Sequence, residues 1–165
     1  MSSTMKDTDV AHALVTAMTA RMRAYVDSAE QCLGTLDDQQ IWSGWLTGED
    51  AVGSLVLRIA GNLDEVVDSI EGRESEVAPL DIRVRSPKSK EDLRAALRRS
   101  MEACTRVVDS VPPDRMGNSC RIRGRETTVA YALIGAASQF SLHLGRMLFL
   151  SRTLGHFSGA PAATS

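Results

Sequence analysis

Three polar residues, Arg58, Gln139 and His143, stand within two largely apolar stretches of the sequence. Gln139 and His143 are four positions apart, so on a helix they would share one face, one turn from each other. Arg58 lies earlier in the sequence, next to the apolar residues Leu55 and Ile59. An amide, an imidazole and a guanidinium that converge in a helical core would form a small polar site. Arginine is suited to holding a carboxylate or a phosphate in a fork, so the expected ligand is a polar or anionic small molecule.

The same three residues also have a purely structural interpretation. Arg58 would pair with a carboxylate or with carbonyls, and His143 would be a hydrogen-bonded core histidine, because buried polar groups usually persist when they are satisfied. The sequence contains no G-x-S-x-G, P-loop or H-E-x-x-H motif. The catalytic residues are therefore unknown, and we expect a protein that is not an enzyme. The alternative is an enzyme that uses His143 as a general base.

One apolar segment must position Gln139 and His143. Residues 127–145 contain no side chain that is formally charged at neutral pH. A helix that is apolar all round is buried, either in a membrane or at the centre of a bundle. The segment is long enough to span a bilayer, but polar residues such as Ser138 and Ser141 would be costly at membrane depth. It therefore predicts the buried central helix of a bundle, with no membrane as partner.

Three further segments carry apolar residues at helical spacing. They predict helices over about residues 9–33, 49–71 and 90–111, the first ended by Gly34 and the third by Pro112. Four helices of this length bury their apolar faces most simply against one another. The predicted fold is all-α, a four-helix bundle with long connections.

The helix ends and connections carry signals of their own. Ser89 with Asp92, and Thr47 with Asp50, have the spacing of N-terminal capping pairs. The polar connection over residues 72–88 is long for two antiparallel neighbours, which predicts that it runs along the bundle.

The chain is expected to form one domain over residues 1–155, followed by a disordered tail over residues 156–165. Trp42 and Trp45 are the only tryptophans, and both fall in the connection before the second long helix. Tryptophan buries a large area while keeping a polar edge. Trp42 is therefore expected either to cover one end of the core or to line a ligand pocket.

The overall charge argues against nucleic acid as a partner. The net charge is −2, whereas a double-stranded DNA binder normally carries a basic excess. Arg121, Arg123 and Arg125 alternate in a segment that could be extended; such a cluster can hold a phosphate or, more commonly, form a solvated edge. Three cysteines without CxxC spacing favour a cytoplasmic location, and the first nine residues lack the apolar core of a signal peptide.

Two segments resemble a known family. LDDQQIWSGWLTGEDAVGSLVLRIAGNL, residues 36–63, and ASQFSLHLGRMLFLSRTLG, residues 137–155, are similar to the DinB-like (YfiT-like) four-helix proteins. The resemblance implies a bundle in which three histidines bind one divalent metal, commonly zinc or nickel. It also implies frequent homodimers, and some relatives are metal-dependent thiol transferases or hydrolases.

The sequence departs from that family at the metal ligands. Arg58 and Gln139 match the first two histidines, so His143 is the one histidine that remains. Arginine has no lone pair for a metal, glutamine is a weak ligand for transition metals, and a catalytic zinc needs three protein ligands. We therefore expect no metal and no other cofactor at this degenerate site.

These observations lead to one functional expectation and one alternative. The first is a cytoplasmic DinB-like protein that acts without catalysis, as a small-molecule-binding or dimerising module, with Arg58, Gln139, His143 and Trp42 as ligand-binding residues. The alternative is a metal-dependent or metal-independent transferase or hydrolase that uses the pocket around His143. The expected partner is a second copy of the chain.

Overall fold

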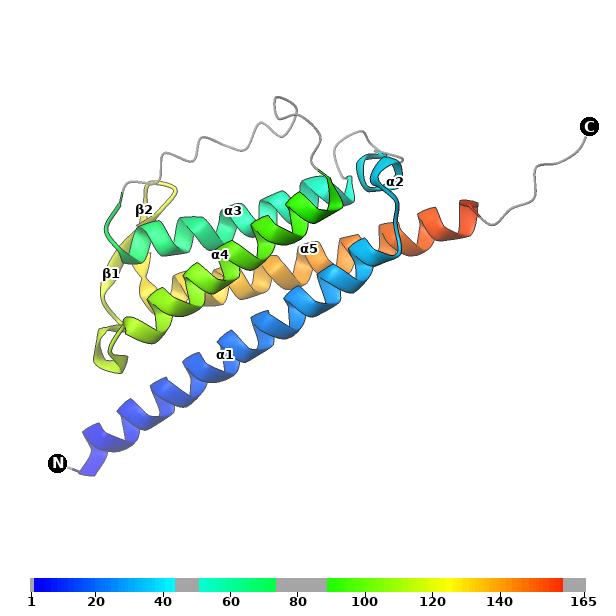
Figure 1. Ribbon diagram of the computed structural model, residues 1–165. Helices are drawn as coiled ribbons and strands as arrows, with labels where there is room; N and C mark the ends of the chain where they lie inside the picture. Colours follow the sequence, from blue (N-terminus) through cyan, green and yellow to red (C-terminus); the bar gives the residue numbers. More distant parts are fainter. Residues whose placement is uncertain (1, 44–50, 74–88, 159–165) are drawn as a thin grey trace, which may run out of the picture.

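The computed structural model describes residues 2–43, 51–73 and 89–158, and the surroundings of side chains from residue 9 to residue 155 within these ranges. Four long helices make up most of this part of the chain (Figure 1). They are α1 (Ser2–Gly34), α3 (Val52–Ile70), α4 (Lys90–Ser110) and α5 (Val129–Ser158). The short helix α2 (Asp38–Trp42) follows α1. The predicted all-α helical bundle is confirmed.

The directions of the helices follow from two contacts between α1 and α5. The Cys32 thiol donates to the Met147 carbonyl at 3.5 Å, and the rings of Tyr25 and Phe140 lie 5.5 Å apart. Both pairs have the same sequence offset, so the two helices run parallel. Figure 1 shows α3 and α4 running the opposite way, from the α2 end toward the far end of the bundle. The end of α3 and the start of α4 therefore lie at opposite ends, as the predicted long connection requires, although most of residues 72–88 lie outside the described ranges.

Side-chain caps start two of the helices. At the start of α2 the side chains of Asp37 and Gln40 each accept a hydrogen bond from the backbone N–H of the other residue. Ser89 and Asp92 form the same reciprocal pair at the start of α4. The predicted cap at Ser89 is confirmed. Helix α3 begins at Val52, after an Ala51 N-cap without a side-chain hydrogen bond. The predicted pair Thr47 and Asp50 lies outside the described residues.

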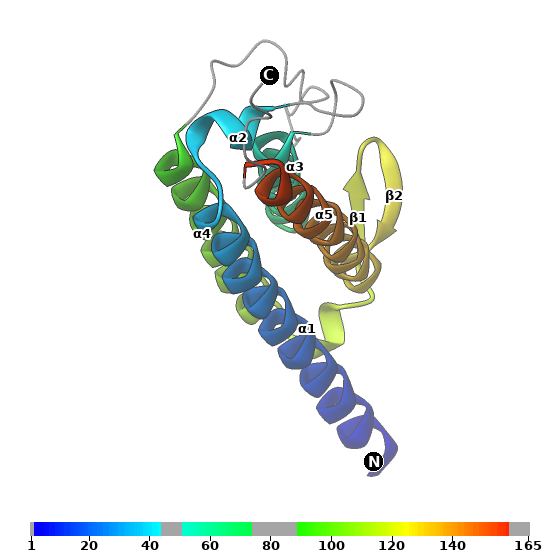
Figure 2. The same cartoon turned by 90° about the vertical axis from the view of Figure 1, so that its right-hand side faces the viewer.

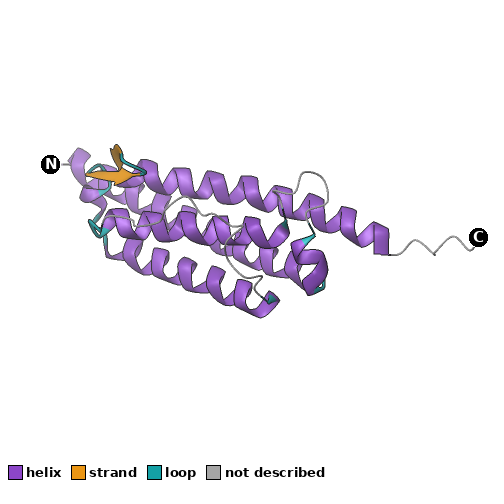
Figure 3. Cartoon of the chain, turned by 90° about the horizontal axis from the view of Figure 1, so that it is seen from above, coloured by secondary structure: helices purple, strands orange, loops and turns teal. Residues whose placement is uncertain are grey.

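A β-hairpin stands at the end of the bundle opposite α2 (Figure 3). After the 3-10 turn η1 (Pro113–Arg115), strands β1 (Ser119–Ile122) and β2 (Arg125–Thr128) pair antiparallel. Arg123 and Gly124, with φ of 50° and 75°, form the two-residue loop, which is the backbone that a tight hairpin needs. The three arginines of the predicted extended segment thus lie near the end of β1 (Arg121), in the turn (Arg123) and at the start of β2 (Arg125).

The prediction that the last helix is buried on all sides is wrong. On α5 the side chains of Tyr131, Ile134, Leu142 and Phe149 are 47 to 69% exposed. The prediction was based on the absence of charged residues, which makes every face of this helix able to pack in a core. In the structure the other described elements cover only one of its faces. Helix α3 is the more enclosed one, because it packs against α2, α4, α5 and β1. The core lies between α3 and the buried faces of the other three long helices.

Helices α1 and α5 reach the two ends of the described chain, at Ser2 and Ser158. Figure 2 shows the N-terminal part of α1 projecting past the other helices. Helix α5 continues through Ser158, three residues past the expected domain boundary at Gly155. Within the described ranges, no helix combines the length and apolarity needed to cross a bilayer.

Candidate functional site

His143 lies on the buried face of α5, where only 7% of its surface is exposed. The neighbouring positions of that face are apolar and buried, among them Phe140, Leu144 and Met147. An imidazole in such surroundings loses hydration that favours its charged form. Burial accordingly lowers the pKa of His143 from its ordinary value of 6.5. His143 therefore sits in the core as a neutral ring near neutral pH.

Arg58 approaches the same place from α3. Its side chain is half-buried, and its positive charge is the second cause that lowers the pKa of His143. Among the described residues no carboxylate forms an ion pair with Arg58. The predicted pairing of Arg58 with a carboxylate is thus not found in this part of the chain. The charge of Arg58 on α3 thus acts on the imidazole of His143 on α5, while a shared ligand site of the two residues stays a prediction.

The imidazole of His143 has an unsatisfied polar atom. Its Nδ1 is buried and has no hydrogen-bond partner among the residues that the structure describes. An unpaired buried polar group costs about 1–3 kcal/mol, and such groups are rare in folded proteins. The expectation of a hydrogen-bonded core histidine is therefore wrong for this nitrogen. A ligand that accepts a hydrogen bond from Nδ1 would remove the penalty.

Gln139 lies one turn before His143, but its side chain is exposed. Residues four apart on a helix differ by about 40° in direction, and α5 is buried on one face only. Because of this difference in direction, Gln139 points to solvent although His143 points into the core. Gln139 is therefore not part of a core trio, and its role as a ligand-binding residue stays a prediction. The three residues instead differ in solvent exposure: His143 is buried, Arg58 is half-buried and Gln139 is exposed.

Trp42 covers the end of the bundle that α2 occupies. Its side chain is half-buried and packs on the core, with ring atoms 2.8 Å from where a Cβ on Gly53 would be. Any side chain at position 53 would thus collide with the indole ring of Trp42, which explains a glycine there. This contact agrees with Trp42 as a cover of the core, while a role in ligand binding stays a prediction. Trp45 lies outside the described residues.

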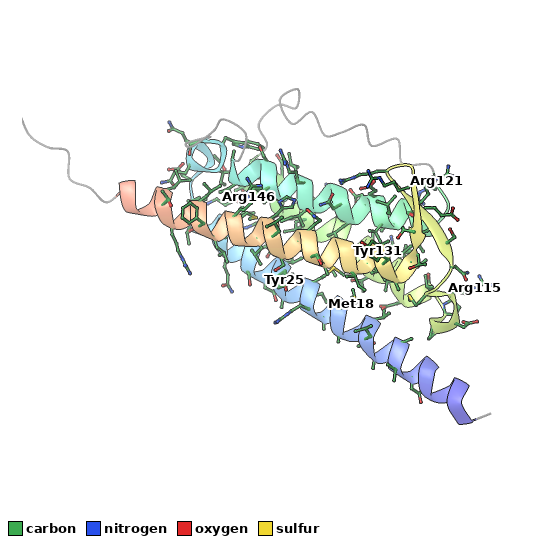
Figure 4. All side chains as sticks on the ribbon, turned by 180° about the vertical axis from the view of Figure 1, so that it is seen from behind. Met18, Tyr25, Arg115, Arg121, Tyr131 and Arg146 are labelled. Atoms are coloured by element: carbon green, nitrogen blue, oxygen red, sulfur yellow. The ribbon has the colours of Figure 1, made fainter. Side chains whose placement is uncertain are left out.

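Arg146 is a residue that the sequence analysis did not single out. It follows His143 by three positions on α5 and is exposed; Figure 4 labels its side chain. Residues three apart share a flank of a helix, so Arg146 adds a second positive charge within one turn of His143. The spacing from His143 was the signal that could have identified it.

The residues at this site do not fit a divalent metal. In the part of the chain that the structure describes, no group of three His, Cys, Asp or Glu side chains is placed to hold one. Arg58 brings positive charge, which repels a cation, and Gln139 lies on the surface. The expectation that no metal or cofactor binds remains a prediction.

The other candidate groups do not converge. In the hairpin Arg121 pairs with Glu126, and Ile122 with Arg125, so Arg121 and Arg125 point to opposite faces. Arg123 instead contacts α3, where it donates to Glu65 and Asn62. This arrangement agrees with a solvated edge rather than a phosphate cluster. Burial also raises the pKa of the Cys104 thiol to about 11, which makes it unreactive.

The buried histidine predicts a pH dependence of stability. Because the folded pKa of His143 lies below 6.5, the unfolded chain binds the proton first as the pH falls. The stabilisation is present above pH 6.5 and is lost as the pH falls through the folded pKa. Denaturant titrations between pH 7.5 and 5 should show the wild type losing free energy of unfolding relative to His143→Gln. Parallel pH profiles for the two proteins would contradict this placement of His143.

Comparison with known proteins places the chain in one group. Residues 9–158 match the sequence model of a family described as a protein of unknown function, DUF1572. No curated protein matches the chain. The match begins within α1, continues to the end of α5 and includes the hairpin, Arg58 and His143. The chain therefore belongs to the DUF1572 family.

Proposed function

We propose that this protein is a DinB-like bundle that binds a small carboxylate between Arg58 and His143 without catalysis, and that it works as a cytoplasmic homodimer. One observation carries the proposal. The buried Nδ1 of His143 has no hydrogen-bond partner within the described residues, and Arg58, whose positive charge acts on that imidazole, is half-buried and forms no ion pair there.

A carboxylate would satisfy both groups at once. A neutral imidazole can donate from one ring nitrogen, and a guanidinium donates two parallel hydrogen bonds to a carboxylate. Such a ligand would remove the penalty of the unpaired nitrogen and neutralise Arg58. Gln139 and Arg146, both exposed on α5 within a turn of His143, would contact the outer part of the ligand.

The resemblance to DinB-like proteins supports the same interpretation. Arg58 takes the position of a histidine that binds the metal in those proteins. A guanidinium there supplies a fixed positive charge without any metal, so an anion that a metal would attract retains a cationic partner. The chemistry of the site would then have changed from metal binding to anion binding.

An enzyme is the second candidate, and the lowered pKa of His143 favours it. A neutral imidazole at physiological pH is the form that acts as a general base. The described site offers His143 no nucleophile and no hydrogen-bonded carboxylate to orient the ring, so we place binding first.

Calorimetric titration with monocarboxylates from acetate to benzoate tests the proposal. Arg58→Gln keeps polar atoms but removes the charge, so we expect the dissociation constant to rise about tenfold or more, since hydrogen bonds to charged groups are worth about 1.5–3 kcal/mol. Arg106→Gln, an exposed arginine on α4, is the matched control and should bind like the wild type. Absence of binding to any carboxylate, or equal binding by Arg58→Gln, would overturn the proposal.

A further inference from the structure

An uncharged stripe runs along the exposed face of α5. Its large members are Tyr131, Ile134, Leu142 and Phe149, with exposed fractions of 69, 47, 56 and 62%. Their positions, together with Ser138 and Gly145, follow the three- and four-residue spacing of one helix face. At 1.5 Å per residue, the α5 stripe is about 27 Å long. It faces away from the core stripe of Phe140 and Met147.

The composition of the α5 stripe is unusual for a solvent-facing helix. The outer face of a surface helix normally carries charged residues, whereas residues 127–145 have none. At their exposed fractions, Tyr131 and Phe149 alone present roughly 300 Å² of mostly apolar surface. That is more than a third of the roughly 800 Å² that each partner buries in a standard interface. The exposed side chains of Ile134 and Leu142 lie between these two rings and extend the surface into one stripe, and contiguous exposed apolar surfaces larger than a few hundred Å² commonly mark interaction sites.

Two glycines on this side of α5 lack a reason within the chain. A Cβ added at Gly135 or at Gly145 would meet no atom of the described residues within 4 Å. Gly53, in contrast, keeps space for Trp42. Glycine destabilises a helix interior relative to alanine, so its presence at two open positions favours close approach by a backbone from outside the chain.

We propose that the α5 stripe is the surface through which the protein self-associates, with α5 of a second copy packed antiparallel against it. The stripe is self-complementary about its midpoint, near position 140. In the antiparallel arrangement Tyr131 meets the second copy's Phe149, and Leu142 faces the small Ser138. A two-fold axis generates both contacts twice, as an isologous interface requires.

Charge complementarity selects the antiparallel arrangement. The exposed charges nearest the two ends of the stripe are Arg125 and Glu126 in β2, which precedes α5, and Arg152 near the other end. Glu126 accepts one hydrogen bond from the Ser119 hydroxyl of the same hairpin, and its exposed carboxylate can still meet a second cation. Antiparallel packing brings Arg152 of each copy near Glu126 of the other. Parallel packing would place Arg152 beside Arg152 and align the two helix dipoles, which is unfavourable. The occupant that fits the stripe is therefore a second copy of this chain.

The oligomeric mass of two leucine variants tests the surface. Leu142 in the stripe and Leu14 on α1 are both 56% exposed, so Leu142→Glu and Leu14→Glu are a matched pair. Light scattering of the full chain should give a wild-type mass twice the 17.9 kDa of one chain. Leu142→Glu should be monomeric, with a dimer dissociation constant at least about 100-fold higher, because each dimer would bury two unpaired charges. Leu14→Glu should remain dimeric.

The assignment of the α5 stripe as an interface rests on the self-association proposed above. The possible results distinguish a failure of the dimer itself from a failure of this interface. A wild type that is monomeric at about 100 μM would overturn both. A dimeric wild type with a dimeric Leu142→Glu would overturn the α5 stripe and leave the dimer. Circular dichroism of both variants should match the wild type, since both side chains are exposed.

Cross-linking tests the antiparallel arrangement. A short bismaleimide should join two copies of Ser138→Cys, whose positions lie near the two-fold axis. It should not join two copies of Tyr131→Cys, which antiparallel packing holds roughly 27 Å apart. Efficient cross-linking of Tyr131→Cys beyond the level of the wild type, which keeps the half-buried Cys120, would overturn the antiparallel arrangement.

Discussion

Replacement of Phe140 by alanine should lower the free energy of unfolding by about 3–5 kcal/mol. Phe140 is 1% exposed, and its ring packs at 58° against Tyr25 of α1. Truncation removes one of the contacts between the parallel helices α1 and α5 and leaves a cavity that the surrounding structure can only partly fill. Urea denaturation followed by circular dichroism measures the change.

Phe149→Ala is the matched control for Phe140→Ala. Phe149 lies on the same helix but is 62% exposed, so its truncation should change the stability of the monomer by no more than about 0.5 kcal/mol. Both variants are best compared in the Leu142→Glu background, so that loss of self-association does not contribute. Similar losses for the two phenylalanines would mean that α5 is rotated from the orientation described above.

Replacement of Arg123 by alanine should destabilise the protein by about 1–3 kcal/mol. Arg123 donates to Glu65 at 3.0 Å and to Asn62 at 2.8 Å, and the Glu65 side chain is only 11% exposed. Without the arginine, Glu65 would be a buried carboxylate with no cation beside it. The loss stays below that of a fully buried pair because Arg123 itself is 71% exposed and screened by water.

Two further substitutions in the hairpin distinguish the contribution of the ion pair to stability from that of the backbone conformation at Arg123. Arg121→Ala removes an exposed arginine of the same hairpin and should change stability by no more than about 0.5 kcal/mol. Arg123→Gly should be less destabilising than Arg123→Ala by up to about 1 kcal/mol, because φ at this position is 50° and glycine adopts it without strain. An Arg121→Ala loss as large as that of Arg123→Ala would contradict the proposed contact with Glu65.

Local sequence signals predicted much of the fold. The Ser89 and Asp92 pair and the apolar stripes depend on residues within a few turns of each other, so they predicted the start of α4 and the bundle. The rotation of α5 depends on which neighbours cover it. A segment without charge is compatible with burial on every side or on one, and the exposed Tyr131 and Phe149 show that one face is left open.

The candidate site was predictable in part for the same reason. Spacing along α5 placed His143 in the core, and the apolar neighbours of Arg58 placed it on the facing helix. Spacing could not show that a rotation of about 40° leaves Gln139 in solvent. Nor could it show that Nδ1 of His143 lacks a partner, because satisfaction of a buried atom depends on side chains from every helix around it.

Titration of the His143 imidazole by NMR, with and without benzoate, tests carboxylate binding most directly. His143→Gln assigns the signal against the other histidines. We predict that the pKa of His143 lies below 6.5 in the free protein and rises when benzoate binds, because a negative charge beside the ring favours its protonated form. In Arg58→Gln the effect of benzoate should be lost. A His143 pKa that does not change with benzoate, or that changes equally in Arg58→Gln, would contradict a carboxylate site between these two residues.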